Sequence, residues 1–208
     1  MQLHFTTLRG WAFLAIWMAS AAQSIAGPEV KLWTVHSMTR VSRTESPTAD
    51  QLVEISAAKG ECEPFQVIAR AEVSSLMNAR VRLSDFVHPA GDRIHTTQVH
   101  YQHYVDVVES TEFSPYPPME HPDALIPVVE GKPIFQLVSN LPAEGVINQP
   151  FWIDVHVPRE AKAGRYEASF SLSTADGTEL AKFPVQRQVW DFEISKRPTL
   201  KSAFDVDL

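Results

Sequence analysis

The chain has 208 residues, a formal net charge of −7 and 44% hydrophobic residues. This composition is that of a globular protein and excludes a disordered chain. The acidic balance and the scattered Lys and Arg residues argue against a nucleic-acid partner, because binding to phosphates needs clustered cations.

Residues 1–26 have the features of a secretory signal peptide. A single cation, Arg9, precedes an apolar run at residues 11–22, and Ser24 and Ala26 supply the small residues that a signal peptidase reads. The run is short for a membrane span. We therefore expect cleavage after Ala26, a secreted or periplasmic bacterial protein, and no stable membrane insertion afterwards. An uncleaved N-terminal anchor is the alternative.

The part of the chain after residue 26 has frequent strand signals and almost no helical ones. No stretch keeps a 3.6-residue apolar rhythm for three turns without a proline. Strands rich in β-branched and aromatic residues are predicted at 53–55, 65–69, 81–83 and 99–108.

The C-terminal third alternates apolar and polar residues most regularly. Because successive side chains of a strand point to opposite sides, each strand there is expected to bury one face, as in an antiparallel sheet. The two apolar faces consist of Phe151, Ile153, Val155 and Val157, and of Tyr166, Ala168, Phe170 and Leu172.

A hairpin turn is predicted at 174–179, where an Asp-Gly pair supplies the left-handed backbone geometry. A closing strand follows at 183–194, in which Pro184 indicates a sheet edge or a bulge. Short strands separated by turn signals predict an all-β fold, an antiparallel β-sandwich of immunoglobulin-like or jelly-roll-like type, over residues 27–195.

Residues 111–133 interrupt the strand pattern. This stretch contains six prolines and is longer than an ordinary hairpin connection. We predict an irregular insertion that is either functional or packed as a compact loop.

His95, His100 and His103 lie close together in the sequence. On a strand, His100 and His103 point to opposite faces because they are an odd number of positions apart. A zinc site needs converging ligands, so we predict surface or pocket histidines and no metal site.

Cys62 is the only cysteine, which excludes an internal disulfide. We predict a small buried residue rather than a reactive thiol. Its neighbours Glu61 and Glu63 share one face if the segment is extended and would then form an acid pair. We favour the alternative, in which Gly60 and Glu61 end a turn and Glu63 accepts hydrogen bonds at the strand start, because paired catalytic carboxylates usually come from separate segments.

Acidic residues concentrate in or beside the insertion, near Tyr116 and His121. A sugar or calcium contact is one interpretation, but the spacing of a calcium loop is missing. We favour a solvated acidic loop. No phosphate-binding loop, nucleophile elbow or HExxH motif occurs, so we predict no catalytic or cofactor-binding residue. The acids are Glu109, Glu112, Glu120 and Asp123.

Four segments carry a family resemblance. Together they resemble the N-terminal β-sandwich of secreted bacterial proteins related to glycoside hydrolase family 123, in particular the relatives with domain of unknown function 4091. The resemblance covers about residues 30–208. The segments are GECEPFQVIAR (60–70), HPDALIP (121–127), NQPFWIDVHVPREAKAGRYEASFSLS (148–173) and VWDFEISKRPTLKSAF (189–204).

The resemblance implies that a (β/α) barrel follows residues 198–204. In the family, neighbouring Asp and Glu residues of that barrel assist the N-acetyl group of the substrate in cleaving a β-linked N-acetylgalactosamine. A barrel needs more than about 200 residues, whereas the printed chain ends four residues later. We therefore expect residues 196–208 to be a linker toward a missing barrel, as in a truncated, fragmentary or split protein.

The expected function is that of a non-catalytic accessory domain that braces a barrel or a downstream polypeptide. A free-standing carbohydrate-binding module with a glycan partner is the alternative, and a small hydrolase using the acids of the insertion is a third interpretation. The candidate interface or ligand contacts are Tyr116, His121, Asp123 and Phe204, with Asp123 capping the following turn. An exposed apolar patch is expected near residues 203–208 and the insertion.

Overall fold

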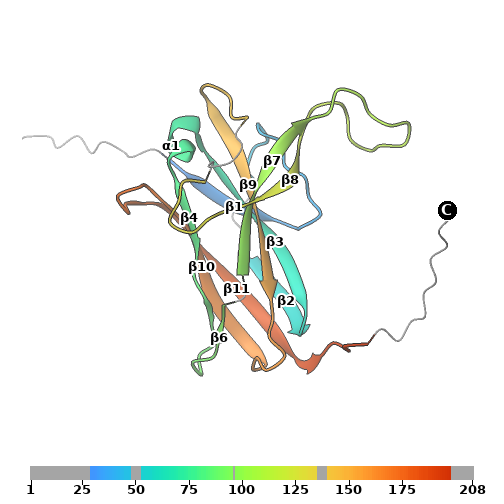
Figure 1. The fold of residues 1–208 in the computed structure, drawn as a ribbon, viewed down its shortest axis with the longest axis vertical. Helices are drawn as coiled ribbons and strands as arrows, with labels where there is room; N and C mark the ends of the chain where they lie inside the picture. The colour runs from blue at the N-terminus through green and yellow to red at the C-terminus, as the bar shows by residue number, and fades with distance from the viewer. Residues whose placement is uncertain (1–28, 48–52, 96, 135–139, 198–208) are drawn as a thin grey trace, which may run out of the picture.

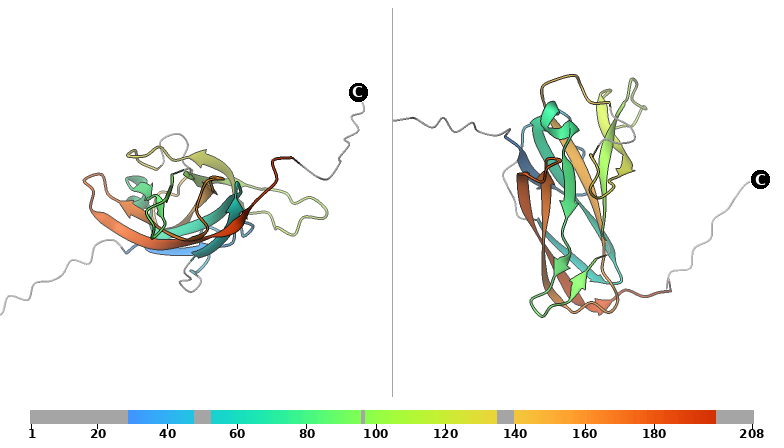
Figure 2. Two further views of the ribbon diagram at one scale, coloured as in Figure 1. Left: turned by 90° about the horizontal axis from the view of Figure 1, so that it is seen from below. Right: turned by 60° about the vertical axis from the view of Figure 1, so that its left-hand side comes forward.

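The computed structural model describes residues 29–47, 53–95, 97–134 and 140–197. These residues form two β-sheets that pack face to face, as Figures 1 and 2 show. The predicted all-β sandwich is therefore confirmed. The expected signal peptide and the candidate contact Phe204 lie outside the described residues.

Among the described residues, the first sheet has five strands, and all neighbouring strands are antiparallel. Their order across the sheet is β1 (Lys31–Val35), β3 (Cys62–Glu72), β9 (Val146–His156), β7 (Thr97–Asp106) and β8 (Glu120–Pro127).

The second sheet has six strands within the described ranges, and β2 and β11 run parallel while the other pairs are antiparallel. A short helix, α1 (Val73–Met77), follows β3. No helix in the described part of the chain is long and apolar enough to cross a membrane. The strand order is β2 (Val53–Lys59), β11 (Glu179–Glu193), β10 (Gly164–Ser173), β5 (Phe86–Val87) and β6 (Arg93–Ile94), with β4 (Arg80–Leu83) also beside β10.

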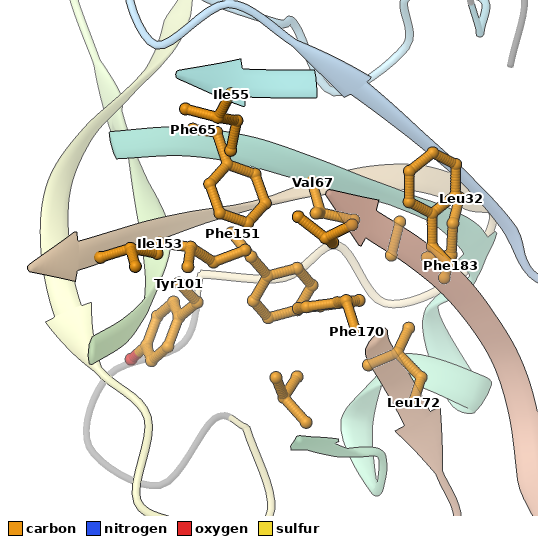
Figure 3. Close-up of a cluster of buried hydrophobic side chains, with 14 of the residues drawn as sticks. Leu32, Ile55, Phe65, Val67, Tyr101, Phe151, Ile153, Phe170, Leu172 and Phe183 are labelled. Carbon is orange, nitrogen blue, oxygen red and sulfur yellow. The ribbon is translucent and has the colours of Figure 1, made fainter. Parts of the chain in front are cut away.

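The hydrophobic core lies between the two sheets (Figure 3). Phe151 and Ile153 of β9 enter it from the first sheet, and Phe170 and Leu172 of β10 enter it from the second. The rings of Phe151 and Phe170 lie 5.4 Å apart between centroids. Burying each such side chain contributes about 1.5–3 kcal/mol. The predicted inward faces are confirmed, although Ala168 is only partly buried.

The β10–β11 hairpin also follows the sequence. Gly177 in its turn has a φ of 89°, in the left-handed region that glycine adopts readily. The amide of Thr174 donates to the carbonyl oxygen of Thr178 at 2.9 Å and closes the loop. Pro184 lies opposite Ser169 of β10, before the described part of β2 begins to pair with β11. Its missing N–H therefore removes no described ladder bond, although β11 as a whole lies between β2 and β10 and is not an edge strand.

The irregular insertion predicted at 111–133 is partly wrong, because residues 120–127 form strand β8. This strand lies at the edge of the first sheet, where prolines such as Pro122 are tolerated. The register shifts so that Tyr104 faces Pro122 and His103 faces Ala124. Asp123 is the extra residue of this bulge, which breaks the alternation that would have marked the strand.

A segment that we call the covering loop, residues 36–47, lies on part of the outer face of the first sheet. Val41 from this loop packs with Trp33 of β1 and Ile68 of β3 in a small cluster separate from the main core. The loop is therefore fixed by apolar packing and by hydrogen bonds. Three side chains donate to its carbonyl oxygens at 2.8 Å: Gln66 to Ser37 and Thr39, Asn148 to Ser42 and Glu45, and Tyr104 to Val41.

Candidate functional site

The β7–β8 hairpin carries three of the four candidate residues. Its connection projects from one end of the sandwich (Figure 1). Tyr116 of this connection packs edge-on against His121 of β8, with 5.6 Å between the ring centroids. The guanidinium carbon of Arg40 lies 4.9 Å from the centre of the Tyr116 ring. The structure thus brings Tyr116 and His121 together, with a cation on the tyrosine face.

Asp123 does not join this cluster. It is an exposed bulge residue within β8 and precedes further strand residues, so the expected capping of a following turn does not match its position. Glu109 and Glu112 are exposed, as a solvated acidic loop predicts.

Glu120 is the acid that the sequence interpretation misplaced, because its carboxylate accepts a 2.8 Å hydrogen bond from Nε of Arg43. Arg43 is 7% exposed and lies with its guanidinium carbon 4.1 Å from the centre of the Tyr104 ring. Its Nη2 donates to the side-chain oxygen of Asn140 at 2.7 Å. Burial raises the pKa of Tyr104 well above its usual range, although Arg43 acts in the opposite direction. The four residues attach the covering loop to the hairpin.

The histidines behave as predicted from strand geometry. His100 and His103 occupy positions of opposite parity on β7, and His95 contacts Asp85 instead, with 3.0 Å between Nδ1 and the carboxylate. Within the described ranges, no group of three or more His, Cys, Asp or Glu side chains is placed to hold a metal ion.

The prediction that Cys62 is buried is wrong. Cys62 is exposed at the start of β3, opposite His156 of β9. Partial burial and the charge of Asp154 raise the pKa of its thiol. The neighbouring turn is confirmed, because the amide of Ala58 donates to the Glu61 carboxylate at 2.7 Å. Glu61 is therefore occupied by backbone rather than by an acid partner.

An aromatic patch that the sequence interpretation missed lies at the end of β11. Trp190 and Phe192 stack with 5.5 Å between ring centroids and an interplanar angle of 15°. They are 43% and 55% exposed, and Ile194 beside them is 37% exposed. We call these three residues the exit patch, because the described chain leaves the sandwich there. The aromatic side chains at this end of β11 therefore lie outside the core.

The signal for the exit patch is present in the sequence. The buried residues of β11 include Val185 and Val189, at odd positions. Trp190 and Phe192 stand at even positions and so face outward from the second sheet. Parity rather than hydrophobicity identifies them.

The strand that carries the exit patch is held firmly. On the other side of β11, Nζ of Lys59 lies 2.7 Å from the Asp191 carboxylate. Arg159 forms an ion pair with Glu193 and donates to the carbonyl oxygen of Ile194 at 2.8 Å. The aromatic pair is therefore presented on an ordered strand end, although β11 extends there beyond its described pairing with β10.

Comparisons with known proteins agree on a family. The sequence profile of the glycoside hydrolase 123 N-terminal domain matches residues 36–174, which is more than half of the chain. The fold is similar to a structure of a family 123 glycoside hydrolase from Clostridium perfringens, described for glycolipid glycan hydrolysis. That match has a TM-score of 0.54 and 14% sequence identity, and covers 79% of this chain and 28% of that chain.

Other structures are more distant. The N-terminal domain of PorA matches with a TM-score of 0.26 at 10% identity, covering 78% of this chain and 99% of that chain. A PapD-like domain of human CEP192 has a TM-score of 0.29 at 10% identity, covering 88% and 100%. A search of curated proteins finds no match. On the strength of the profile match over residues 36–174, the chain belongs to the family of glycoside hydrolase 123 N-terminal domains.

Proposed function

We propose that this chain is the non-catalytic accessory domain of a secreted glycoside-hydrolase-like protein and that it braces a (β/α) barrel. Two findings support the proposal. The matching profile is that of an N-terminal domain, and the similarity to the Clostridium enzyme covers only 28% of that chain. Export after removal of residues 1–26, a sandwich domain over 27–195 and a linker at 196–208 are parts of the same proposal.

The observation that carries the proposal is the exit patch. Stacked, rigidly held aromatic side chains resemble the residues that dominate binding energy in protein interfaces. They also lie beside Ser195–Arg197, the last described residues, so a polypeptide that continues from there reaches them easily. The end of β11, which carries the exit patch, and the β7–β8 connection lie toward opposite ends of the sandwich (Figures 1 and 2). The hairpin residues Tyr116 and His121 therefore do not belong to this surface.

The test uses the polypeptide encoded directly after the codon of Leu208, produced as a separate chain. If it is a barrel, adding the present chain should give a stable complex in sedimentation experiments and should raise the melting temperature of the barrel. Replacing both Trp190 and Phe192 with Ser should weaken the complex by at least about tenfold, because two anchor residues are lost.

Phe113 provides the matched control. It is an aromatic residue with 89% exposure in the β7–β8 connection, so Phe113→Ser removes a similar exposed ring away from the exit patch and should leave the complex unchanged. The proposal is wrong if no barrel is encoded and the chain binds no family 123 barrel. Hydrolysis of N-acetylhexosaminides by the chain alone would also contradict the non-catalytic role.

A further inference from the structure

A second uncovered surface lies on the outer face of the first sheet, beside the area that the covering loop occupies. We call it the shelf and define it by Trp152 and Asp154 of β9, His100 and Gln98 of β7, and Pro127 of β8. Strand pairing places these residues side by side, because Trp152 and Asp154 stand opposite His100 and Gln98, and His100 stands opposite Pro127.

Trp152 is the centre of the shelf and is partly exposed. Its indole N–H donates to Oδ1 of Asp154 at 2.9 Å. Asp154 lies two residues further along the same face, so this bond draws the indole along the strand and holds the ring over the sheet. A fixed, partly exposed indole is a suitable surface for stacking a flat apolar face of a ligand.

The second carboxylate oxygen of Asp154 has an unusual neighbour. Oδ2 lies 3.8 Å from Nδ1 of His100, which is too far for a hydrogen bond. Nδ1 of His100 is buried and has no hydrogen-bond partner among the described residues. Oδ2 of Asp154 can therefore accept a hydrogen bond from a ligand hydroxyl, whereas the buried Nδ1 of His100 is closed to a ligand. Asp154 is 32% exposed and His100 only 14%, so a ligand hydroxyl reaches the carboxylate and not the imidazole.

We propose that the shelf is a binding site for a pyranose sugar. The apolar face of the sugar ring stacks on Trp152, and a ring hydroxyl donates a hydrogen bond to Oδ2 of Asp154. The exposed Gln98 offers an amide to a further hydroxyl, and the rigid ring of Pro127 borders the site on β8. A pyranose combines one apolar ring face with several hydroxyls, which matches this set of groups.

The sugar site goes beyond the bracing role and does not depend on it. The exit patch lies on the outer face of the second sheet, whereas the shelf lies on the outer face of the first. Trp190 therefore serves as an internal control for Trp152. Trp33, which is 1% exposed beneath the covering loop, is a second control.

The test is fluorine NMR on the full chain, labelled with 5-fluorotryptophan and produced in a secreting bacterial host. The resonance of Trp152 is assigned with Trp152→Phe. The probes are the methyl β-pyranosides of glucose, galactose and N-acetylgalactosamine, titrated to tens of millimolar. We expect at least one of them to shift the Trp152 resonance saturably and to leave the resonances of Trp33 and Trp190 in place.

Asp154→Asn is the decisive variant. The asparagine keeps an oxygen that accepts from Trp152 but presents an N–H₂ group where Oδ2 accepts from the ligand. Affinity should therefore fall at least about tenfold, because a ligand hydroxyl loses its acceptor. Trp190→Ser should leave the affinity unchanged.

Three results would overturn the proposal. The first is a Trp152 resonance that no pyranoside moves. The second is a shift that survives Asp154→Asn unchanged. The third is a Trp152 resonance that moves when a barrel polypeptide is added but with no sugar, which would make the shelf a protein interface.

Discussion

Arg187 of β11 places a charge inside the core. Its side chain is fully buried, and its guanidinium carbon lies 5.8 Å from the centre of the Phe86 ring. Only Nη2 has a partner, the carbonyl oxygen of Glu63 at 2.8 Å. Nε and Nη1 have no hydrogen-bond partner among the described residues. We predict that replacing Arg187 with Met stabilises the protein, because a buried, poorly paired cation is less favourable than a buried apolar chain.

The magnitude follows from the pKa. Burial lowers the pKa of Arg187 from the ordinary arginine value to about 10, against the opposing attraction of Glu63. At 1.36 kcal/mol per pKa unit, this displacement corresponds to about 3 kcal/mol of destabilisation. The folded-state pKa lies below the unfolded one, so the full penalty applies at every pH below about 10. Loss of the hydrogen bond to Glu63 costs about 1 kcal/mol, which leaves an expected gain of about 2 kcal/mol.

Equilibrium unfolding in urea, followed by circular dichroism, measures this gain. Arg187→Ala is the matched variant, because it removes the same charge but leaves a cavity, and cavities of that size cost about 2–5 kcal/mol. We expect Arg187→Met to be more stable than the parent protein. Arg187→Ala should be as stable as the parent protein or less stable than it. If Arg187→Met lowers the free energy of unfolding by about 1 kcal/mol or more, the guanidinium is well compensated and the reasoning from its unpaired nitrogens fails.

Three further predictions rest on single positions. Cys62 is exposed with a raised pKa, so a thiol reagent should modify one thiol per native chain slowly at neutral pH and faster toward pH 9; no reaction before unfolding would contradict its placement. Burial raises the pKa of Tyr104, so in an alkaline absorbance titration this phenol should ionise only on unfolding. Because its folded-state pKa exceeds the unfolded one, its contribution to stability should fall as pH rises past about 10. Gly164→Ala should cost about 2–3 kcal/mol in urea unfolding, since φ is +132° and the new Cβ would lie 2.5 Å from Nε2 of His88. Gly177→Ala, with open space around it, should cost only about 1 kcal/mol.

The core strands could be predicted from the sequence because their pattern is simple. β9 and β10 each pack one face against the opposite sheet. Apolar core residues, such as Phe151 in β9 and Phe170 in β10, therefore recur at every second position of each strand. That period does not depend on which strand lies next to which. The order of strands across each sheet, including the parallel pair of β2 and β11, leaves no such mark and was not predicted.

The edge strand β8 shows how a local irregularity hides a strand. The bulge at Asp123 moves the residues after it to the opposite parity, and Pro122 and Pro127 each remove a backbone donor. Both features are typical of loops in a sequence, yet both are compatible with a strand that pairs on one side only.

The ion pair of Arg43 and Glu120 could not be predicted, because the two residues come from segments 77 positions apart. Their charges had no visible partner in the sequence, and Glu120 was interpreted as part of a solvated acidic loop. The pair forms because Tyr104 supplies an aromatic surface beneath the guanidinium. Such contacts depend on the register between β7 and β8, which the bulge sets.

The division of the outer faces explains how one small domain can have two separate uncovered surfaces. The covering loop fills part of the first sheet through polar side chains, Gln66 and Asn148, that would otherwise be exposed there. Gln66, which donates to a carbonyl oxygen of this loop, pairs directly with Trp152 of the shelf. The exit patch lies on the other sheet, where β11 extends past β10. A barrel held at the exit patch therefore leaves the shelf on the opposite face, so docking and sugar binding should be separable by Trp190→Ser and Asp154→Asn in one set of measurements.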